Sequence, residues 1–370
     1  MTISIVLDIG EFASKIGFGG ENEPRSIFFT LVGEPRYKNM EFSVSEKEFY
    51  IGNEVSSSLG LYKITRPIYK GNIRDWPLYK AIIDYTFFQL KVDPTIVNVL
   101  YLIHPLMNNE DKKKIIKMFF EQYQVAGFYP VLDALLTMYA GGFQTGLIVE
   151  LGASCSRIIP IYEGFKIEHA IKIINIGGTV LDSFMQVKMN EIGFRSDSSV
   201  QKELLRVIKE KACFVSLDFD EDIKNKNKYR KSFSLPDGNI IELTSERFIV
   251  PELLFKPELF NLEDPPLHLE ILDSIEKCDI DIRSKLLNNI FLTGGTSCFP
   301  QLEFRLQQEL EIELIQRGIT SIKPRIIAPK KRMFSPWIGG SILSCIPEFQ
   351  SSWLSRKDYY RNGIPIEWIS

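Results

Sequence analysis

Two acidic residues in this chain each stand two positions before a glycine at the end of an apolar run. They are Asp8, which precedes Gly10, and Glu150, which precedes Gly152. Glycine lets a backbone approach a ligand closely, because it has no side chain and tolerates positive φ. An acid beside such a glycine is suited to hold a phosphate and its metal ion. The two motifs therefore predict phosphate chemistry at two places in the chain.

The segments around these acids repeat one pattern. Ile5 to Phe18 and Leu147 to Tyr162 each contain an apolar run, the acid and glycine, a short polar turn, a basic residue and a second apolar run. Such apolar runs predict strands buried on both faces, and two runs around a turn predict a hairpin. Because the hairpin occurs twice, we expect two similar α/β lobes whose turns converge on one cleft.

A third stretch, Ile290 to Thr296, predicts a buried strand that delivers Gly294 and Gly295 into a turn. The helix expected over Gln301 to Leu314 follows it. A glycine pair after a strand is a weak signal by itself. Beside two hairpins that point to one cleft, it predicts a wall for the base and ribose of a nucleotide.

The composition is that of an ordinary globular protein. Of 370 residues, 45% are hydrophobic and 25% are charged, and the formal net charge of -3 argues against broad binding to nucleic-acid phosphates. A chain of this length can bury large cores, so two lobes are expected. The N-terminus lacks a basic region, and apolar stretches such as Ile96 to Ile103 are too short to cross a bilayer. We therefore expect neither a signal peptide nor a membrane segment.

The cysteines and histidines do not form metal-binding motifs. The five cysteines are dispersed and the three histidines are isolated in the sequence. An odd, scattered set of cysteines without a signal peptide predicts reduced thiols in the cytosol or nucleus. We expect no histidine to act as a metal ligand or a catalytic base.

Hydrophobic periodicity and turn residues predict the elements between these motifs. Residues 28–66 have little apolar periodicity and predict a small subdomain inserted into the first lobe, whereas Lys224 to Lys231 predicts an exposed, mobile loop. The other expected elements are helices at Leu78–Leu90, Asn109–Tyr123, Asp133–Tyr139 and Val200–Ser216, a helix opened by Ile176–Thr179, a strand at Val97–Ile103, a turn between strands at Leu235–Gly238 and a loop at Glu263–Pro266.

These motifs resemble those of actin and its relatives, in the same order over essentially the whole chain. The stretches that carry the resemblance are Ile16–Gly20 with Pro24-Arg25, Pro160–Gly164, Ile208–Cys213, Leu217–Phe219, Leu235–Gly238, Lys277–Arg283, Leu292–Thr296 and Trp337–Leu343. The resemblance implies the α/β actin fold, a hexokinase-like pair of duplicated lobes around a nucleotide cleft. The expected small lobe is 1–140 plus 335–370, with an inserted subdomain at about 30–66. The expected large lobe is 141–334, with an inserted subdomain at about 177–262.

The resemblance also implies a nucleotide, ATP or ADP with Mg²⁺, and the residues that hold it. The two hairpin turns correspond to the family's two phosphate loops. No residue is expected to ligate a metal directly. The residues that match the family's nucleotide site are Asp8, Gly10, Lys15, Glu150, Gly152, Lys209, Glu210, Gly294, Gly295 and Thr296.

Departures from the family pattern surround the expected γ-phosphate. Glu11 and Phe12 stand in the first turn, where actin has small residues. A carboxylate near a polyphosphate costs Coulomb energy unless it points away, and phenylalanine lacks the backbone freedom of glycine. The remaining departures are Ala153 and Ser154 in the second turn, Asp133 at a glutamine position, Arg157 at a histidine position and Met333 at a lysine position. We therefore expect a nucleotide that is held but not hydrolysed, and no catalytic residue.

The first turn and the C-terminus resemble a particular group of actin-related proteins, those at the pointed end of dynactin. In the C-terminal region, Ser355–Tyr360 and Ile364–Trp368 carry this likeness. It implies a subunit that caps an actin-like filament and supports dynein-driven transport along microtubules. The implied partners are the filament subunit of dynactin, the pointed-end complex subunits and, indirectly, dynein, in the cytoplasm and cytoskeleton. Neither nucleic acid nor membrane is expected as a partner.

The filament contact expected from the resemblance is a groove formed by Tyr139–Phe143 and a helix at Ser335–Phe349. The opposite end carries an altered loop, Lys38–Glu48, with three glutamates, and the charged segment Lys224–Lys231. A subunit that can join a filament through one end and presents an altered surface at its other end is expected to cap that filament. The apolar residues expected at the filament contact are Trp337, Ile338, Ile342, Leu343 and Ile346.

Other functions stay open at this point. One alternative is a divergent actin-like ATPase that forms filaments, which requires competent phosphate loops and a docking loop. A second is an actin-related subunit of a nuclear chromatin-remodelling complex, since such relatives also lose hydrolysis and have a similar composition. A third is an actin-like protein whose loops have simply diverged.

Overall fold

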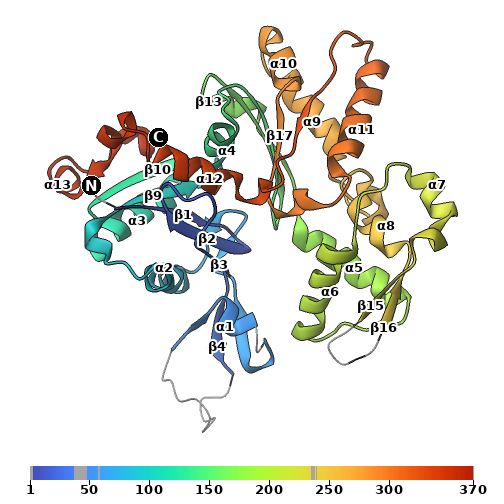
Figure 1. The fold of residues 1–370 in the computed structure, drawn as a ribbon, viewed down its shortest axis with the longest axis horizontal. Helices are drawn as coiled ribbons and strands as arrows, with labels where there is room; N and C mark the ends of the chain where they lie inside the picture. The colour runs from blue at the N-terminus through green and yellow to red at the C-terminus, as the bar shows by residue number, and fades with distance from the viewer. Residues whose placement is uncertain (1–2, 37–47, 57–58, 235–237, 239, 370) are drawn as a thin grey trace. The chain divides into compact units, whose positions relative to one another are not determined.

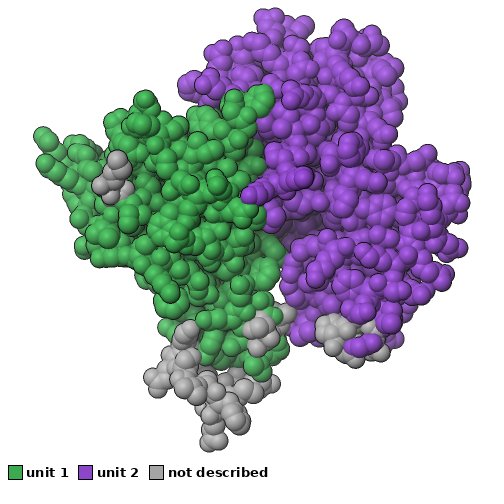
Figure 2. Space-filling view, in the orientation of Figure 1, with its two compact units in different colours: residues 1–143, 334–370 green, residues 144–333 purple. Residues whose placement is uncertain are grey.

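The computed structural model describes residues 3–36, 48–56, 59–234, 238 and 240–369. The chain forms two compact units. Unit 1 comprises residues 1–143 and 334–370, and unit 2 comprises residues 144–333 (Figure 2). In the described part of the chain, no helix is both long enough and apolar enough to cross a membrane.

Unit 1 is built on a mixed sheet, whose described strands follow the order β19-β10-β9-β1-β2-β3 (Figure 1). The predicted first hairpin is confirmed: β1 pairs antiparallel with β2 and parallel with β9. Three consecutive residues of β1 are fully buried because the strand is covered on both faces, as its unbroken apolar run predicts. The strands are β1 Ile3–Ile9, β2 Ala13–Phe18, β3 Ser26–Phe29, β9 Val97–Ile103, β10 Gly127–Leu132 and β19 Leu354–Ser355.

The helices of unit 1 begin and end where their caps predict. Asp75 accepts the N–H of Leu78 at 3.0 Å at the start of α2, and Asn108 accepts the N–H of Asp111 at 2.7 Å at the start of α3. The predicted helix 109–123 is confirmed, but its second part, Met118–Gln122, is a π-helix. The helices are α1 Asn53–Ser56, α2 Trp76–Leu90, α3 Asn109–Lys117, α4 Asp133–Gly141, α12 Ser335–Leu343 and α13 Arg356–Asn362.

A smaller sheet, with the order β5-β4-β6, lies within residues 32–65 of unit 1. Its core contains Leu31 and Val55. The short hairpin β7–β8 follows it and leads into α2. Most of the acidic loop, residues 37–47, lies outside the described residues. The strands are β4 Val32–Pro35, β5 Tyr50–Ile51, β6 Tyr62–Thr65, β7 Ile68–Tyr69 and β8 Asn72–Ile73.

Unit 2 repeats the sheet-and-hairpin plan. In its described residues the strand order is β13-β12-β11-β17-β18, with β14 also paired to β12. The predicted second hairpin is confirmed as β11 and β12, and β17 is buried throughout, as predicted. The strands are β11 Gly146–Leu151, β12 Ser156–Tyr162, β13 Phe165–Lys166, β14 Lys172–Ile174, β15 Lys231–Ser234, β16 Ile240–Leu243, β17 Ile290–Thr293 and β18 Ile326–Ile327.

The helices of unit 2 correct two predictions. The helix expected over Val200–Ser216 is α6 Ser199–Ala212, which ends four residues earlier than predicted. It ends there because the N–H groups of Phe214 and Val215 donate to the carbonyls of Arg247 and Pro300, outside the helix. The other helices are α5 Gly178–Glu191, α7 Phe219–Lys224, α8 Glu246–Glu252, α9 Leu267–Glu276, α10 Ile280–Leu287 and α11 Leu302–Gln316.

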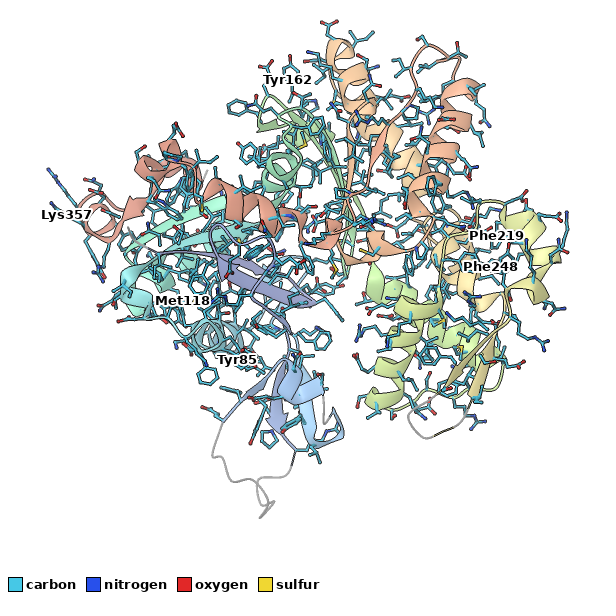
Figure 3. All side chains as sticks on the ribbon, in the orientation of Figure 1. Tyr85, Met118, Tyr162, Phe219, Phe248 and Lys357 are labelled. Atoms are coloured by element: carbon cyan, nitrogen blue, oxygen red, sulfur yellow. The ribbon has the colours of Figure 1, made fainter. Side chains whose placement is uncertain are left out.

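The second correction concerns Lys224–Lys231, which was expected to be a mobile loop. It contains the end of α7, a 3₁₀ turn at Lys226–Tyr229 and the start of β15. Tyr229 fixes this segment, since its hydroxyl donates to Asp222 at 2.5 Å and its ring contacts Phe248. Phe219 at the start of α7 also lies against Phe248 (Figure 3). The strands β15 and β16 pair antiparallel on either side of the predicted turn, but Leu235, Pro236 and Asp237 lie outside the described residues.

Helix α12 closes the core of unit 1. It packs so closely on α4 that a Cβ atom at Gly339 would lie 1.9 Å from the carbonyl oxygen of Leu136. The expected helix Ser335–Phe349 is wrong in its second part, because α12 ends at Leu343 and a 3₁₀ helix begins only at Glu348. Pro347 precedes that second helix and has no N–H with which to continue the first.

Trp337 on α12 is a core residue and not a filament contact, so this part of the prediction is wrong. Its side chain is fully buried, and its Nε1–H donates to the carbonyl of Val6 on β1 at 3.1 Å. The indole therefore joins α12 to the central strand of the sheet. A filament partner has no access to it.

We expect Trp337→Ala to lower the free energy of unfolding by about 3–5 kcal/mol, because it leaves a large cavity beneath α12. Ile342→Ala on the same helix is the matched control and should change it by less than about 0.5 kcal/mol, since Ile342 is exposed. Urea unfolding followed by far-ultraviolet circular dichroism measures both variants. Equal losses in the two variants would contradict the burial of Trp337.

Candidate functional site

The first acid of the predicted site is neutralised within its own hairpin. Asp8 on β1 and Lys15 on β2 are cross-strand partners, and Lys15 Nζ lies 2.6 Å from Asp8 Oδ2. Both side chains are largely buried, which strengthens a charge-assisted hydrogen bond. The structure thus brings together two residues that the sequence assigned to the site. It also shows that each is the other's partner.

Glu11, in the turn between β1 and β2, is held by a backbone group of the β7–β8 hairpin. Its Oε2 accepts the N–H of Lys70 at 2.8 Å. Lys70 has a positive φ of 46°, which non-glycine residues rarely adopt, so the turn that presents this N–H is tightly defined. The carboxylate does not swing freely but is hydrogen-bonded within unit 1.

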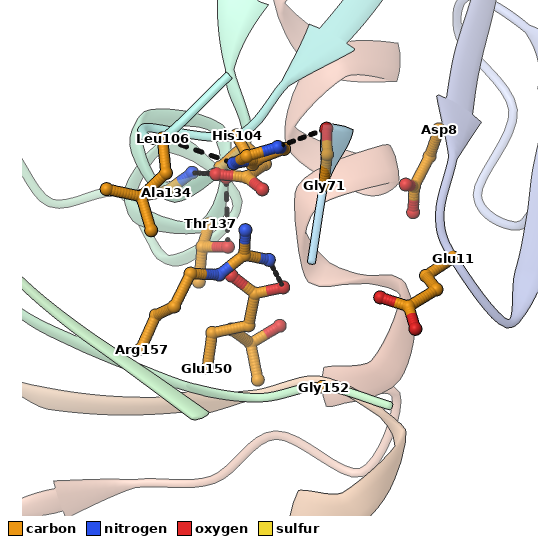
Figure 4. Close-up of polar contacts among 12 residues, drawn as sticks. Asp8, Glu11, Gly71, His104, Leu106, Ala134, Thr137, Glu150, Gly152 and Arg157 are labelled. Carbon is orange, nitrogen blue, oxygen red and sulfur yellow. Dashed lines mark hydrogen bonds and ion pairs between the residues drawn. The ribbon is translucent and has the colours of Figure 1, made fainter. Parts of the chain in front are cut away.

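His104 fixes the same β7–β8 turn through the carbonyl of Gly71 (Figure 4). Its Nδ1 accepts the N–H of Leu106 at 3.1 Å, so in the neutral imidazole the proton lies on Nε2. Nε2–H then donates to Gly71 O at 2.5 Å. The histidine acts as a support for the turn.

Phe12 connects the first turn to the end of β3 and to Arg66, which directly follows β6. The guanidinium of Arg66 lies 4.7 Å above its ring and donates to its carbonyl at 3.2 Å. Thr30 N–H donates to the same carbonyl at 2.9 Å, and the ring of Phe29 meets the Phe12 ring edge-on. Side chains of unit 1 therefore hold the first turn in one shape.

The second acid repeats the arrangement of the first within unit 2. Glu150 on β11 and Arg157 on β12 are cross-strand partners, and Arg157 Nη2 lies 2.5 Å from Glu150 Oε1 (Figure 4). Both side chains are again largely buried. Arg157, which the sequence noted only as a departure at a histidine position, is thus the direct partner of a predicted site residue.

Backbone hydrogen bonds fix the turn after β11. The carbonyl of Gly152 accepts the N–H of Gly178 at 3.0 Å and the hydroxyl of Thr296 at 2.9 Å. The carbonyl of Ala153 accepts the N–H of Thr179 at 2.8 Å. The start of α5 therefore lies directly against the turn. The N–H groups of Gly178 and Thr179 at this helix start are thus occupied by the carbonyls of the turn.

Lys209 on α6 is hydrogen-bonded to the start of α5, and Glu210 is bonded to its own helix. Lys209 Nζ donates to the carbonyl of Gly178 at 2.9 Å and lies 2.7 Å from Asp182 Oδ1. Burial raises the pKa of the Asp182 carboxyl, although the nearby Lys209 ammonium opposes this. Glu210 instead accepts from Arg206 on its own helix, at 2.6 Å.

Sequence reasoning missed Gly178, Thr179 and Asp182 as parts of this cluster. It recognised the segment only as a helix start, although a glycine pair before a helix is a signal for a phosphate site. A Cβ atom at Gly178 would lie 3.0 Å from Thr296 Oγ1 and 3.5 Å from Lys209 Nζ. These distances show that the start of α5 lies among predicted site residues.

The two glycines after β17 differ in what the fold requires of them. Gly294 has a φ of 87°, and a Cβ atom there would lie 2.3 Å from the carbonyl oxygen of Leu151. Gly295 begins a 3₁₀ turn, and a Cβ atom there would meet no described atom within 4 Å. A side chain at position 294 would clash with β11, so this position requires glycine. A small side chain at position 295 would meet no described atom within 4 Å.

The predicted filament residues differ in their access to a partner. Ile342 and Ile346 are exposed, with 46% and 38% of their surface accessible, and Tyr139 on α4 is exposed to 36%. Ile338 and Leu343 are partly buried against the core that contains Trp337. Tyr139 and Ile342 lie on α4 and α12, which pack against each other.

The sequence matches the family model for Actin over residues 1–367. The chain therefore belongs to the actin family, and the predicted fold class is confirmed. Proteins of this family generally bind ATP or ADP with Mg²⁺. That the assigned residues hold a nucleotide in this chain stays a prediction, as does the convergence of the two turns.

The carboxylates of the two hairpins do not form a metal site built from protein side chains alone. Asp8 and Glu150 each direct an oxygen to a basic side chain within 2.6 Å. Within the described ranges, no group of three or more His, Cys, Asp or Glu side chains could hold a metal ion. Magnesium in nucleotide sites is usually held by waters, by the phosphates and by one or two carboxylates, so such an all-protein site is not required for it.

We expect Gly294→Ala to lower the melting temperature and the free energy of unfolding by about 1–3 kcal/mol, because it adds strain at positive φ and a clash with Leu151. Gly295→Ala is the matched control and should leave the melting temperature nearly unchanged. Differential scanning calorimetry of both variants without nucleotide gives the comparison. A larger loss for Gly295→Ala than for Gly294→Ala would contradict the assignment.

Proposed function

We propose that this chain is a structural actin-related subunit that binds an adenine nucleotide without hydrolysing it and caps the pointed end of the dynactin filament. Within the actin family, the motifs in its first turn and C-terminus favour the actin-related protein ten/eleven group. Its place is then the cytoplasm and cytoskeleton. Its partners are the last filament subunit and the pointed-end subunits, and through them dynein.

The observation that carries the loss of hydrolysis is the fixed first turn. Glu11 is hydrogen-bonded to Lys70, and Phe12 is held by Arg66 and Thr30. Backbone N–H groups that stabilise a transferring phosphoryl group must be aimed at it, and small residues make that approach easy. A carboxylate and a phenyl ring at these two positions oppose it.

The position expected to orient the attacking water is also changed. Asp133 is the first residue of α4, and its Oδ1 accepts the N–H of its neighbour Ala134 at 2.6 Å. An ionised carboxylate can only accept hydrogen bonds, whereas the amide of a glutamine both donates and accepts. Glu150, the acid nearest to the second turn, is engaged by Arg157. These contacts favour a subunit that retains its nucleotide.

Purified protein should therefore release phosphate from ATP no faster than a buffer control, either alone or assembled with its partners. The reason is that the first turn carries a carboxylate and a phenyl ring where hydrolysis needs backbone donors aimed at the γ-phosphate. A coupled phosphate-release assay makes the measurement, with polymerising actin as the positive control. Turnover comparable to that of actin would refute this part of the proposal.

The exposed apolar residues of α4 and α12 support filament binding at one end. Tyr139, Ile342 and Ile346 are exposed on or next to two helices that pack against each other. Single exposed apolar residues are ordinary, but a group on neighbouring elements marks an interaction surface. An actin-like neighbour would cover this group with its own apolar residues.

Ile342→Asp should detach the protein from the filament, because the contact would bury an unpaired charge. Ile192→Asp is the matched control, since Ile192 has the same exposed fraction of 46% but lies at the end of α5 in unit 2. Both variants should fold normally. Co-purification with tagged dynactin measures retention, which Ile192→Asp should leave unchanged.

The same experiment separates the proposal from the alternatives. Recovery of dynactin subunits with the wild-type chain supports the capping function. Recovery of a chromatin-remodelling complex instead would assign the chain to the nucleus and overturn it. Long homopolymers of the purified chain would show that both of its ends are competent, which a cap excludes.

A further inference from the structure

The segment Lys224–Lys231 gives unit 2 an exposed basic surface between the end of α7 and the start of β15 (Figure 1). Five of its eight residues are lysine or arginine, none is acidic, and all five basic side chains are exposed. In the described part of the chain, two of them have an acidic partner: Lys224 lies 3.9 Å from Glu221, and Arg230 lies 3.4 Å from Glu242. Exposed pairs of this kind contribute little to stability. The other three lysines present their charge to solvent.

Two acids of α7, the helix that leads into the segment, bind neutral groups. Asp222 accepts the hydroxyls of Ser216 at 2.6 Å and Tyr229 at 2.5 Å. Glu221 accepts the side-chain amide of Asn225 at 2.7 Å. These hydrogen bonds satisfy both carboxylates locally, so neither depends on a lysine of the segment for its partner. The positive charge of the segment is therefore not the counterpart of a buried acid.

The segment is held in one conformation by Tyr229. The hydrogen bond to Asp222 raises the pKa of Tyr229 to about 12, so its hydroxyl remains a donor at neutral pH. Its ring contacts those of Phe214 and Phe248, and its carbonyl accepts from Arg247 Nη1 at 2.6 Å. A partner that binds here meets a backbone that is already ordered, which reduces the entropy lost on binding.

The charges around the segment favour an acidic polypeptide over a nucleic acid or a membrane. Asp220 and Glu221 on α7 expose 82% and 60% of their side chains just before the lysines in the sequence. These acids would repel the regularly spaced phosphates of a nucleic acid or a layer of anionic headgroups. A polypeptide can instead place acids opposite the lysines and neutral residues opposite α7. Such a distribution of charge makes a surface selective.

We propose that Lys224–Lys231 is a docking surface for an acidic segment of a partner polypeptide. Lys226, Lys228 and Lys231 bind carboxylates of the partner, and the exposed amide of Asn227 binds its polar groups. The inference goes beyond the capping function and does not rest on it, because it concerns one surface of unit 2 and the charge of the partner that covers it.

The test uses the full-length protein and a fluorescein-labelled oligoglutamate peptide as the probe. Fluorescence anisotropy gives the dissociation constant at about 50 and about 200 mM NaCl. We expect saturable binding that weakens at least about threefold at the higher salt, because ions screen the attraction between exposed charges. A labelled peptide of alternating glycine and serine should not bind. Absence of saturable binding to the oligoglutamate peptide would overturn the inference.

Matched double variants assign the binding to this surface. Lys226→Gln with Lys228→Gln removes two exposed charges and should weaken binding at least about fivefold. Lys113→Gln with Lys114→Gln removes the same charge from α3, where Lys113 already pairs with Glu110 at 3.1 Å. This control should bind within about twofold of the wild type. Equal losses in the two double variants would show that net charge alone determines binding, and the assignment to the segment would fall.

Further measurements separate charge, folding and the class of partner. Lys226→Arg with Lys228→Arg keeps both charges and should bind as the wild type does, and a loss equal to that of the glutamine variant would contradict the role of charge. Thermal melting followed by circular dichroism should give the wild-type melting temperature for every variant, because the changed side chains lie at the surface. The wild type is also titrated with single-stranded RNA and with vesicles of phosphatidylcholine and phosphatidylserine. Tighter binding to either than to the peptide would overturn the choice of a polypeptide partner.

Discussion

The interaction on which both turns depend is the ion pair across each hairpin. An acid at the end of a buried strand is costly unless a cation compensates it, because water cannot solvate it fully there. Lys15 and Arg157 provide that compensation from the returning strand. The acid can then stand beside the glycine turn without destabilising the sheet. The same compensation limits what else the acid can do, since its oxygen is already engaged.

The two turns beyond these pairs are stabilised in different ways. In unit 2, backbone groups from α5 and the hydroxyl of Thr296 bind the carbonyls of the turn, and the start of a helix faces it. In unit 1, Glu11 accepts the N–H of Lys70 in the β7–β8 hairpin, and Phe12 is held by Arg66. The turn in unit 2 is thus fixed through its carbonyls, and the turn in unit 1 through the side chains of Glu11 and Phe12.

Local pattern was enough to predict the two hairpins, two further strands and several of the helices. Both hairpins, the strand β17 and the helices α2 and α4 follow from apolar runs, caps and turn glycines, all of which act over a few residues. The helix ends that were wrong depend on distant partners. Helix α6 ends where Arg247 and Pro300 take over the next N–H groups, and Lys224–Lys231 is fixed by the contact of Tyr229 with Phe248. A lysine-rich segment gives no local sign of such an anchor.

The site shows the same division between local and distant causes. The acids, the glycines, Lys15 and Lys209 were assigned by motif, but the pairing of each acid with the basic residue across its hairpin was not predicted. That Arg157 faces Glu150 depends on the hairpin register, and that Trp337 is buried depends on its hydrogen bond to a strand at the other end of the sequence. Hydrophobicity alone made Trp337 and Ile342 look equivalent on α12. The packing of α12 onto β1 and α4 separates them, since one face of the helix is buried in unit 1 and the other is exposed. The capping subunit that we propose would use both faces, the buried one for stability and the exposed one for binding.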